Sequence, residues 1–552
     1  MRPLASSLAA ALLWLLSAAA PPASAALPPD ALRTIRRIAV QDRGRVKPLD
    51  SFARETLNRI TGSPRYGSED PVDTVLAIMA EPSPWQARPM LDVPFRPLRE
   101  ALGMDPHTPQ VSYNDLVASR KLMRMLPAIV EKEQRDEKLT MLEQETMDAF
   151  DRFVSFSGLT EQKVNLVPPP SAMERVWLPV LDLAGHPDER QAAIREAWTA
   201  LMGDVRAGRA EAISTSTRRL AERLRAANPA AYPASWRMDL EVFYNHANPF
   251  WAARLVYVRA ALALLIHLLR PRSRAGRAGL AALWGAAALH AAGILLRVVL
   301  GGRPPVSNFY ETTLWLPFVA VALALVFGRV YRVTYFGLAA AILAAITLTV
   351  SAHLPLDSSI SPVVAVLRSN LWLTIHVLTI VASYGALALA TVLAHLYGAL
   401  FLARRRGRHP VLAPLDLFLY RTIQVGVVLL AGGIMLGAVW ANASWGRYWG
   451  WDPKETWALI TLLWFIAVLH GRFAGWLNGV GVALSTIGGF LLLLMTYYGV
   501  SFYLVGLHSY AGGSAKPLPP LLIGYLVAEA LFVLAVGLAA LRPGKPFSTP
   551  GV

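Results

Sequence analysis

The densest group of side chains suited to binding chemistry lies in residues 445–457, which read Trp-Gly-Arg-Tyr-Trp-Gly-Trp-Asp-Pro-Lys-Glu-Thr-Trp. The tryptophans of this segment are Trp445, Trp449, Trp451 and Trp457. Large flat indole rings offer a planar macrocycle such as a porphyrin both a stacking surface and an apolar wall, while their N–H groups remain free to bond. The segment therefore suits the binding of a flat, apolar ligand.

The same segment contains a helix-start signal. Asp452 suits an N-cap, and Pro453 suits the first helical position. Glu455 is at the third helical position, where a capping box places a Glu that accepts a hydrogen bond from the N-cap backbone N–H. A helix should begin near Pro453. We expect the three tryptophans that precede it to lie on a loop or a short interfacial helix.

The alternative is an aromatic belt, which multispanning proteins carry at both membrane interfaces. An isolated pair of tryptophans would fit a belt. Four tryptophans and a tyrosine within thirteen residues, joined to a helix-start signal, favour a binding site instead.

The pattern Trp-Gly-x-x-Trp-x-Trp-Asp-Pro-Lys-Glu resembles the WWD signature of the haem-handling membrane proteins that assemble c-type cytochromes. Its Lys-Glu ending is similar to the CcsA/ResC branch, the cytochrome c synthase subunit of System II. Residues 301–312 resemble that family's G-x-x-P-x-S-N-x-Y-E loop, and residues 44–55 resemble a stretch that precedes the membrane core in long CcsA-type chains. The likeness covers roughly residues 278–541.

Haem iron needs axial ligands, and neutral imidazole is the usual one. Of the eleven histidines, His376 and His508 flank the tryptophan segment in sequence, one before and one after. Their contexts, W-L-x-x-H-V and G-L-H-S-Y, are similar to those of the family's outer axial ligands. The resemblance implies that His376 and His508 bind the iron of an outer haem, with Trp445, Trp449, Trp451, Asp452 and Trp457 as its platform.

An inner haem site is implied at His470, whose position is similar to a transmembrane histidine that ligates haem on its way out. The second ligand in the family comes from a companion ResB/CcsB subunit, and no complete companion domain is recognisable in this chain. His290 is the best internal candidate, because a polar ring inside a membrane span is energetically costly and usually has a function. His267 and His395 fit less well, since they lie near helix ends where side chains can snorkel.

Composition excludes an ordinary soluble protein. Hydrophobic residues make up 54% of the 552 residues and concentrate after position 250. The net charge of +16 does not indicate nucleic-acid binding, because many basic residues flank apolar runs and act as orientation signals. The absence of cysteine excludes a disulfide scaffold and a thiol nucleophile within the chain.

The fold class predicted is an all-α polytopic membrane protein with about nine transmembrane helices and an N-terminal, mostly helical extracytoplasmic domain. The predicted spans lie near residues 251–269, 278–300, 311–328, 334–352, 373–402, 421–441, 454–470, 479–503 and 518–541. Arginines gather on alternate loops, which should therefore be cytoplasmic, so the tryptophan segment should share the outer side with the soluble domain.

The predicted domains begin with a signal peptide at residues 1–25, which ends in Ala-Ser-Ala, with an uncleaved anchor as the alternative. They continue with a soluble domain at 26–248, a connecting transmembrane helix at 249–272, a CcsA-like core at 278–541 and a cytoplasmic tail at 542–552.

The resemblance implies a haem lyase subunit of the bacterial inner membrane whose soluble domain and platform face the periplasm. It would export haem b and present ferrous haem to the CxxCH motif of apocytochrome c, whose thiols form the thioethers, so no catalytic residue is expected in this chain. The implied partners are a ResB/CcsB-like companion, apocytochrome c, thiol-reducing proteins and membrane lipid.

Three alternatives remain. One is a haem-delivery protein of the other bacterial assembly route, which normally lacks the Pro-Lys-Glu-Thr continuation, and another is a non-haem multispanning transporter. The third, a respiratory haem b subunit, usually places two ligands about 13 or 14 residues apart on one helix, as a rise of 1.5 Å per residue requires. His376 and His395 are too far apart for that.

Overall fold

The computed structural model describes residues 27–135, 137–171, 174–185, 189–354, 356–362, 371–403, 411–508 and 518–541. The predicted signal peptide and cytoplasmic tail lie outside these residues. The chain forms two compact units. The front unit holds residues up to 134 together with 142–245, and the membrane unit holds mainly the residues from 246 onward.

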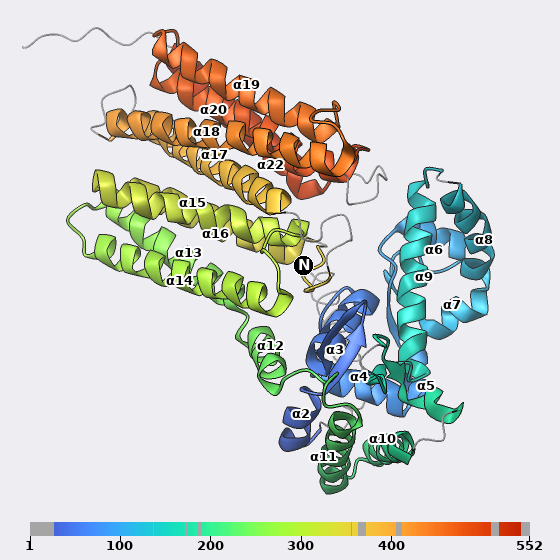
Figure 1. Cartoon of the computed structure of the whole chain (residues 1–552). Helices are drawn as coiled ribbons and strands as arrows, with labels where there is room; N and C mark the ends of the chain where they lie inside the picture. The colour runs from blue at the N-terminus through green and yellow to red at the C-terminus, as the bar shows by residue number, and fades with distance from the viewer. Residues whose placement is uncertain are drawn as a thin grey trace, which may run out of the picture. The chain divides into compact units, whose positions relative to one another are not determined.

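The front unit is mostly helical, as expected, and also contains two small antiparallel sheets that the sequence analysis did not anticipate (Figure 1). The larger sheet has the order β2-β1-β5-β6, and the smaller pairs β3 with β4. The strands are β1 Ala39–Asp42, β2 Arg45–Pro48, β3 Pro89–Asp92, β4 Gln110–Ser112, β5 Asn165–Val167 and β6 Leu178–Pro179. These strands have two to four residues each, too short for period-two patterning to reveal them.

Helices cover these sheets and enclose one hydrophobic core. They are α2 Pro29–Ile35, α3 Leu49–Thr61, α4 Pro71–Ala80, α5 Pro82–Gln86, α6 Arg96–Leu102, α7 Tyr113–Ser119, α8 Lys121–Gln134, α9 Met141–Thr160, the 3-10 turn η1 Val180–Gly185, α10 Glu189–Ala207, α11 Ala210–Ala227 and α12 Ser235–Ala247.

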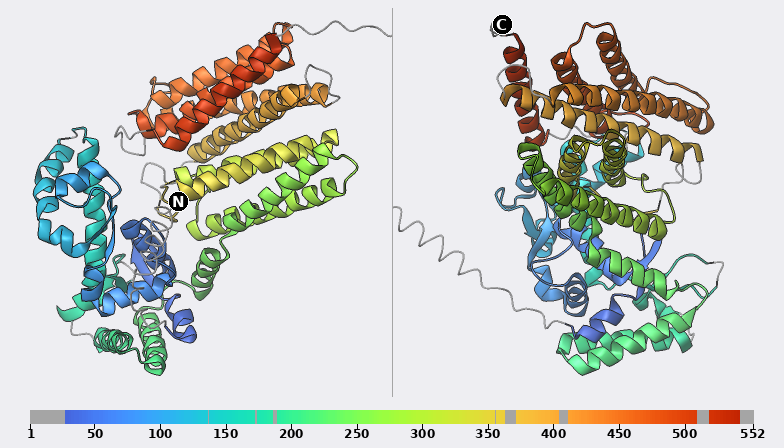
Figure 2. Two further views of the ribbon diagram at one scale, coloured as in Figure 1. Left: turned by 180° about the vertical axis from the view of Figure 1, so that it is seen from behind. Right: turned by 90° about the vertical axis from the view of Figure 1, so that its left-hand side faces the viewer.

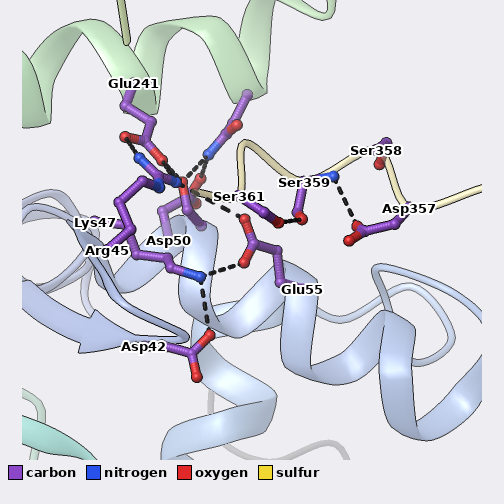
Figure 3. A network of polar contacts seen from close by, with 12 residues as sticks. Asp42, Arg45, Lys47, Asp50, Glu55, Glu241, Asp357, Ser358, Ser359 and Ser361 are labelled. Atoms are coloured by element: carbon purple, nitrogen blue, oxygen red, sulfur yellow. Dashed lines mark hydrogen bonds and ion pairs between the residues drawn. The ribbon is translucent and has the colours of Figure 1, made fainter. Parts of the chain in front are cut away.

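A buried charge network fixes the family-like segment at residues 44–55 (Figure 3). Arg45 on β2 forms two hydrogen bonds of 2.7 Å with Glu241 on α12. Lys47 is buried and pairs with both Asp42 and Glu55. Burial raises the pKa of Glu55, and the nearby Lys47 and Arg45 charges offset part of that shift. The network joins the β1–β2 hairpin to α3 and to α12, the helix that precedes the first membrane span.

Among the described residues of the membrane unit, nine helical segments are long and apolar enough to cross a bilayer. The first runs over Ser235–Leu269 and joins α12 to α13 Pro249–Leu269. The others are α14 Ala275–Gly301, α15 Phe309–Tyr331, α16 Tyr335–His353, α17 Leu371–Ala403, α18 Leu412–Trp445, α19 Pro453–Phe473, a composite span at Gly479–Tyr503, and α22 Pro520–Leu541. The composite span joins α20 Gly479–Leu494, the π-helical turn η3 Met495–Gly499 and α21 Val500–Tyr503. The predicted fold class is confirmed, and the chain is a multi-pass membrane protein.

Successive helices of the membrane unit pack as neighbours (Figure 2). α13 packs against α14 and α16, α17 packs against α18 and α20, and α19 packs against α18 and α20. The predicted bounds differ most at α18, which begins at Leu412 rather than near residue 421. Asp416 lies in the added turns and forms an ion pair with Arg472, so this polar residue does not end the helix.

Candidate functional site

A cavity of about 1330 Å³ opens in the membrane unit among α15, α17, α18, α19 and the π turn. It exceeds the roughly 300–1,000 Å³ typical of small-molecule pockets, so it has room for a large ligand. Its lining residues include His376, Trp440, Trp449, Lys454, Tyr497 and His508.

The wall of this cavity is fixed by the start of α19, which begins at Pro453 as predicted. A carboxylate oxygen of Asp452 accepts a hydrogen bond from the backbone N–H of Lys454 at 2.9 Å. A Glu455 oxygen accepts from the backbone N–H groups of Asp452 and Gly450 at 3.2 and 2.8 Å. The capping box thus satisfies donors that a helix N-terminus leaves unpaired.

Asp452 also orients His508. The Nδ1 atom of His508 lies 2.8 Å from Oδ1 of Asp452, and the backbone N–H of Leu507 donates to Oδ2 at 2.7 Å. Burial would raise the pKa of Asp452, but the hydrogen bonds from His508, Lys454 and Leu507 hold that pKa below its usual value. An ionised carboxylate only accepts, so Nδ1 of His508 carries the proton and Nε2 keeps its lone pair.

His376 has the same arrangement on α17. Its Nδ1 atom lies 2.8 Å from the carbonyl oxygen of Gly433 on α18. A carbonyl oxygen only accepts, so the proton is on Nδ1 and Nε2 keeps its lone pair. The helices can approach this closely because a Cβ atom at Gly437 would lie 2.6 Å from Cε1 of His376.

Trp440 joins the two histidines. Its ring is 6.4 Å from that of His376 with an angle of 8° between the planes, and 6.2 Å from that of His508. Trp440 is only 1% exposed, and its indole N–H has no acceptor within the described part of the chain. The same holds for the indole N–H of Trp449. Buried donors are rarely left unpaired, so a ligand with acceptor groups fits this wall.

The predicted platform tryptophans occupy different positions. Trp449 lines the cavity, whereas Trp445, Trp451 and Trp457 do not. Trp445 is the last residue of α18 rather than part of a loop, and its ring contacts Trp440 and His508 edge-on at 4.6 and 5.4 Å. Trp451 is 69% exposed, and Trp457 lies half-buried in α19. Two of the four therefore contribute to the site or its support.

The structure does not bring His290 and His470 together. His290 is buried on α14 between the rings of Phe250, Tyr257 and Phe318, with ring centres 5.6–5.9 Å away. His470 is exposed near the far end of α19, where its Nδ1 atom lies 2.8 Å from the carbonyl oxygen of Ile466. α14 packs against α13, α15 and α16, whereas α19 packs against α18 and the composite span. Neither histidine lines the cavity.

Sequence reasoning missed two supports of the cavity wall. One is Trp440, whose only signal was its place five residues before the motif. The other is Glu311, which accepts hydrogen bonds from Arg297 at 3.0 Å and Arg303 at 2.6 Å. The sequence analysis placed Glu311 in the family-like loop and at the start of a predicted span, but it did not show these ion pairs. Asn308 caps the helix there, α15. These ion pairs anchor residues 301–312 along the cavity.

The buried Lys454 ammonium is bound within the wall. It donates to the Ser501 hydroxyl at 2.8 Å and to the Tyr497 carbonyl at 3.2 Å. Tyr497 lies in the π turn, whose altered spacing interrupts the regular i to i−4 ladder and makes a carbonyl accessible to another donor. Lys454 therefore joins α19 to the composite span.

Comparisons with known proteins match the part of the chain that carries the cavity. The family model described as Cytochrome C assembly protein matches residues 306–508. Protein NrfI of Wolinella succinogenes is 30% identical over 506 residues, which cover 86% of this chain and 54% of NrfI. The cytochrome c biogenesis proteins CcsA of Guillardia theta and Chlorella vulgaris are 37% and 35% identical over 39% of this chain.

The chain thus spans about half the length of NrfI. It spans 82% and 80% of the two CcsA proteins. Because most of each CcsA protein is matched, these two relatives support assigning the chain to their family. The family named by these matches is the one that the tryptophan segment and the two histidine contexts indicated. The chain belongs to the CcsA-type family of cytochrome c assembly proteins.

Proposed function

We propose that this chain binds ferrous haem b in the described cavity, with iron held between His376 and His508, and presents it for attachment to apocytochrome c. One observation carries the proposal. Both histidines line the same cavity, and in both the Nδ1 atom is engaged, which leaves Nε2 for a ligand.

The attachment needs no nucleophile from this chain. The S–H bond of each thiol in the CxxCH segment adds across a haem vinyl C=C, forming one C–S and one C–H bond, with no atom lost. The chain contains no cysteine, so both thiols come from the substrate. The contribution of the protein is to hold the haem edge beside the thiols until the substrate histidine displaces one axial ligand.

The proposal includes an inner site and a direction of transport. The chain lies in the bacterial inner membrane with its front unit and the cavity on the periplasmic side, and haem b arrives from the cytoplasmic side. His470 is the better inner ligand, because it is an exposed residue whereas three aromatic rings enclose His290. The second ligand comes from a ResB/CcsB-like companion, and thiol-reducing proteins keep the substrate cysteines reduced.

The functional test uses the full chain, a ResB-like companion and an apocytochrome with one CxxCH motif in a host without its own assembly system. Covalent haem in the apocytochrome is measured after denaturing electrophoresis. His376→Ala and His508→Ala should each lower it at least tenfold. His353→Ala is the matched control, because His353 is an exposed histidine at the end of α16 and does not line the cavity.

Two results would overturn the proposal. If both cavity variants attach haem as well as the control, the two histidines do not hold the substrate. If an oxidised haem is attached at the full rate, the requirement for ferrous iron is wrong. A wild-type protein that never carries haem under haem-replete expression would favour the non-haem transporter.

A further inference from the structure

Arg259 occupies an unusual position at the centre of the first membrane span. It is the middle residue of the 21-residue helix α13, about 15 Å from either end at 1.5 Å per residue. The side chain is exposed on the surface of the membrane unit. A cation at this depth is costly in a bilayer, and arginines within spans usually pair with another group or face the bundle interior.

Among the residues that the structure describes from 246 onward, no carboxylate pairs with Arg259. From residue 246 to the end the sequence contains six carboxylates: Glu311, Asp357, Asp416, Asp452, Glu455 and Glu529. Each of them has another hydrogen-bond or ion-pair partner within the described residues. Residues 1–26 contain no acidic residue, so that apolar segment offers no counter-charge.

The surface around Arg259 has the pattern of a helix–helix seam. Its exposed apolar side chains are Trp251, Val258, Leu262, Leu265, Ile266 and Leu269, each 40–70% exposed. From Val258 to Leu269 the spacing of four, three and four residues follows one helix face. The opposite face, with Tyr257 and Leu264, is buried against the neighbouring helices α14 and α16.

We propose that this face of α13 docks a transmembrane helix of another polypeptide that carries an Asp or Glu near its centre. An acidic partner is favoured because its negative charge would complement the positive charge of Arg259. A second copy of the chain in a symmetric contact would bring Arg259 against itself, which disfavours the contact. The inference concerns assembly in the membrane and does not depend on haem binding.

The absence of cysteine allows a direct test with the full-length protein. Ser273→Cys, in the loop just after α13, provides a single site for a fluorescent donor. The probe is an acceptor-labelled transmembrane peptide of 21 Leu and Ala residues with one Glu at its centre. A matched peptide carries Gln instead. Energy transfer is titrated at pH 8 in vesicles of phosphatidylcholine, which has no net charge.

The Glu peptide should bind at least about threefold more tightly than the Gln peptide. Arg259→Leu should abolish this preference, and it should not harm folding, because it removes a charge from a lipid-exposed surface. Arg259→Glu should reverse it, so that a peptide with central Lys binds better. Arg254→Leu is the control on the same helix, since Arg254 lies nearer the helix end and should leave the preference largely intact.

Equal binding of the Glu and Gln peptides would overturn the proposal, as would a preference that survives Arg259→Leu. The competing partner is a lipid phosphate. If the wild type shows no Glu preference but retains more phosphatidylglycerol than Arg259→Leu after purification, Arg259 pairs with lipid and the docking proposal is wrong.

Discussion

At the scale of single residues, one carboxylate connects the helix start to His508, one of the two proposed iron ligands. Asp452 caps α19 through Lys454 and holds Nδ1 of His508. A carboxylate behind a ligating histidine fixes its tautomer and raises its basicity. Space for this contact depends on Gly506, where a Cβ atom would lie 2.5 Å from Oδ2 of Asp452. In the proposed site Asp452 thus acts on haem through His508.

Asp452→Ala should weaken haem binding about 10–100-fold, because it removes the partner of His508 as well as the cap. Haem titration of the apoprotein measures this. Asn478→Ala is the control, since Asn478 caps α20 in the same way without contacting a histidine. Equal losses in the two variants would assign the effect of Asp452 to the cap alone.

The contact between Asp452 and His508 has a defined pH range. The pKa of Asp452 in the folded protein lies below its ordinary 3.8, so its contribution to stability is fully present above pH 3.8. The contribution is lost as the pH falls through the lowered value. Haem retention at pH 4–5 should therefore not decline through protonation of Asp452.

The sequence predicted the helix start at Pro453 correctly, and it singled out His376 and His508, which line one cavity, because each lies in a short local pattern. Their role as iron ligands stays a prediction. The sequence could not assign Asp452 to His508, since 56 residues separate them and only the fold brings them together. Trp440 was missed because a single tryptophan in an apolar helix is an ordinary core residue. Arg259 was missed because the predicted span at 251–269 remains apolar on average despite two arginines.

At the scale of elements, close packing of α17 against α18 places His376. Gly437→Ala should displace the imidazole, because its Cβ would lie 2.6 Å from Cε1 of His376, and haem content should fall severalfold. Gly432→Ala is the matched control on the same helix, since no atom lies within 4 Å of its Cβ position. Haem per protein in the reduced absorption spectrum measures both. Equal haem content would show that this contact does not position His376.

The ends of most spans could be predicted to within a few residues, because Gly, Pro and Arg separate one apolar run of about 20 residues from the next. The π turn at Met495–Gly499 could not be predicted, because one inserted residue leaves no signal in the hydrophobic periodicity. It lies at the cavity, where its Tyr497 carbonyl accepts from Lys454.

At the scale of the whole molecule, the stability of the front unit should depend on pH through Asp73 in the first turn of α4. Burial, with the charge of Asp70, raises the pKa of Asp73 to about 6. A raised folded pKa means that the stabilising contribution is fully present below 3.8 and is lost as the pH rises through about 6.

Asp73→Asn should therefore flatten the decline in stability between pH 4 and 7.5. Because Asp73 is partly exposed, its contribution to this decline in unfolding free energy should be about 1 kcal/mol. Proteolytic resistance of the front unit in the full-length protein measures it. Asp148→Asn, a change at an exposed carboxylate of α9, is the control. A wild-type front unit whose resistance does not change over this range would contradict the role of Asp73.

The proposed function rests on His376 and His508 holding one haem iron in the described cavity. The most direct measurement is the reduced absorption spectrum of the purified protein, co-expressed with the proposed ResB-like companion, for the wild type, His376→Ala and His508→Ala, with and without imidazole. We expect a low-spin spectrum in the wild type, less haem in each variant and recovery of the haem content when imidazole is added. Unchanged haem content and an unchanged spectrum in both variants would contradict the proposed function.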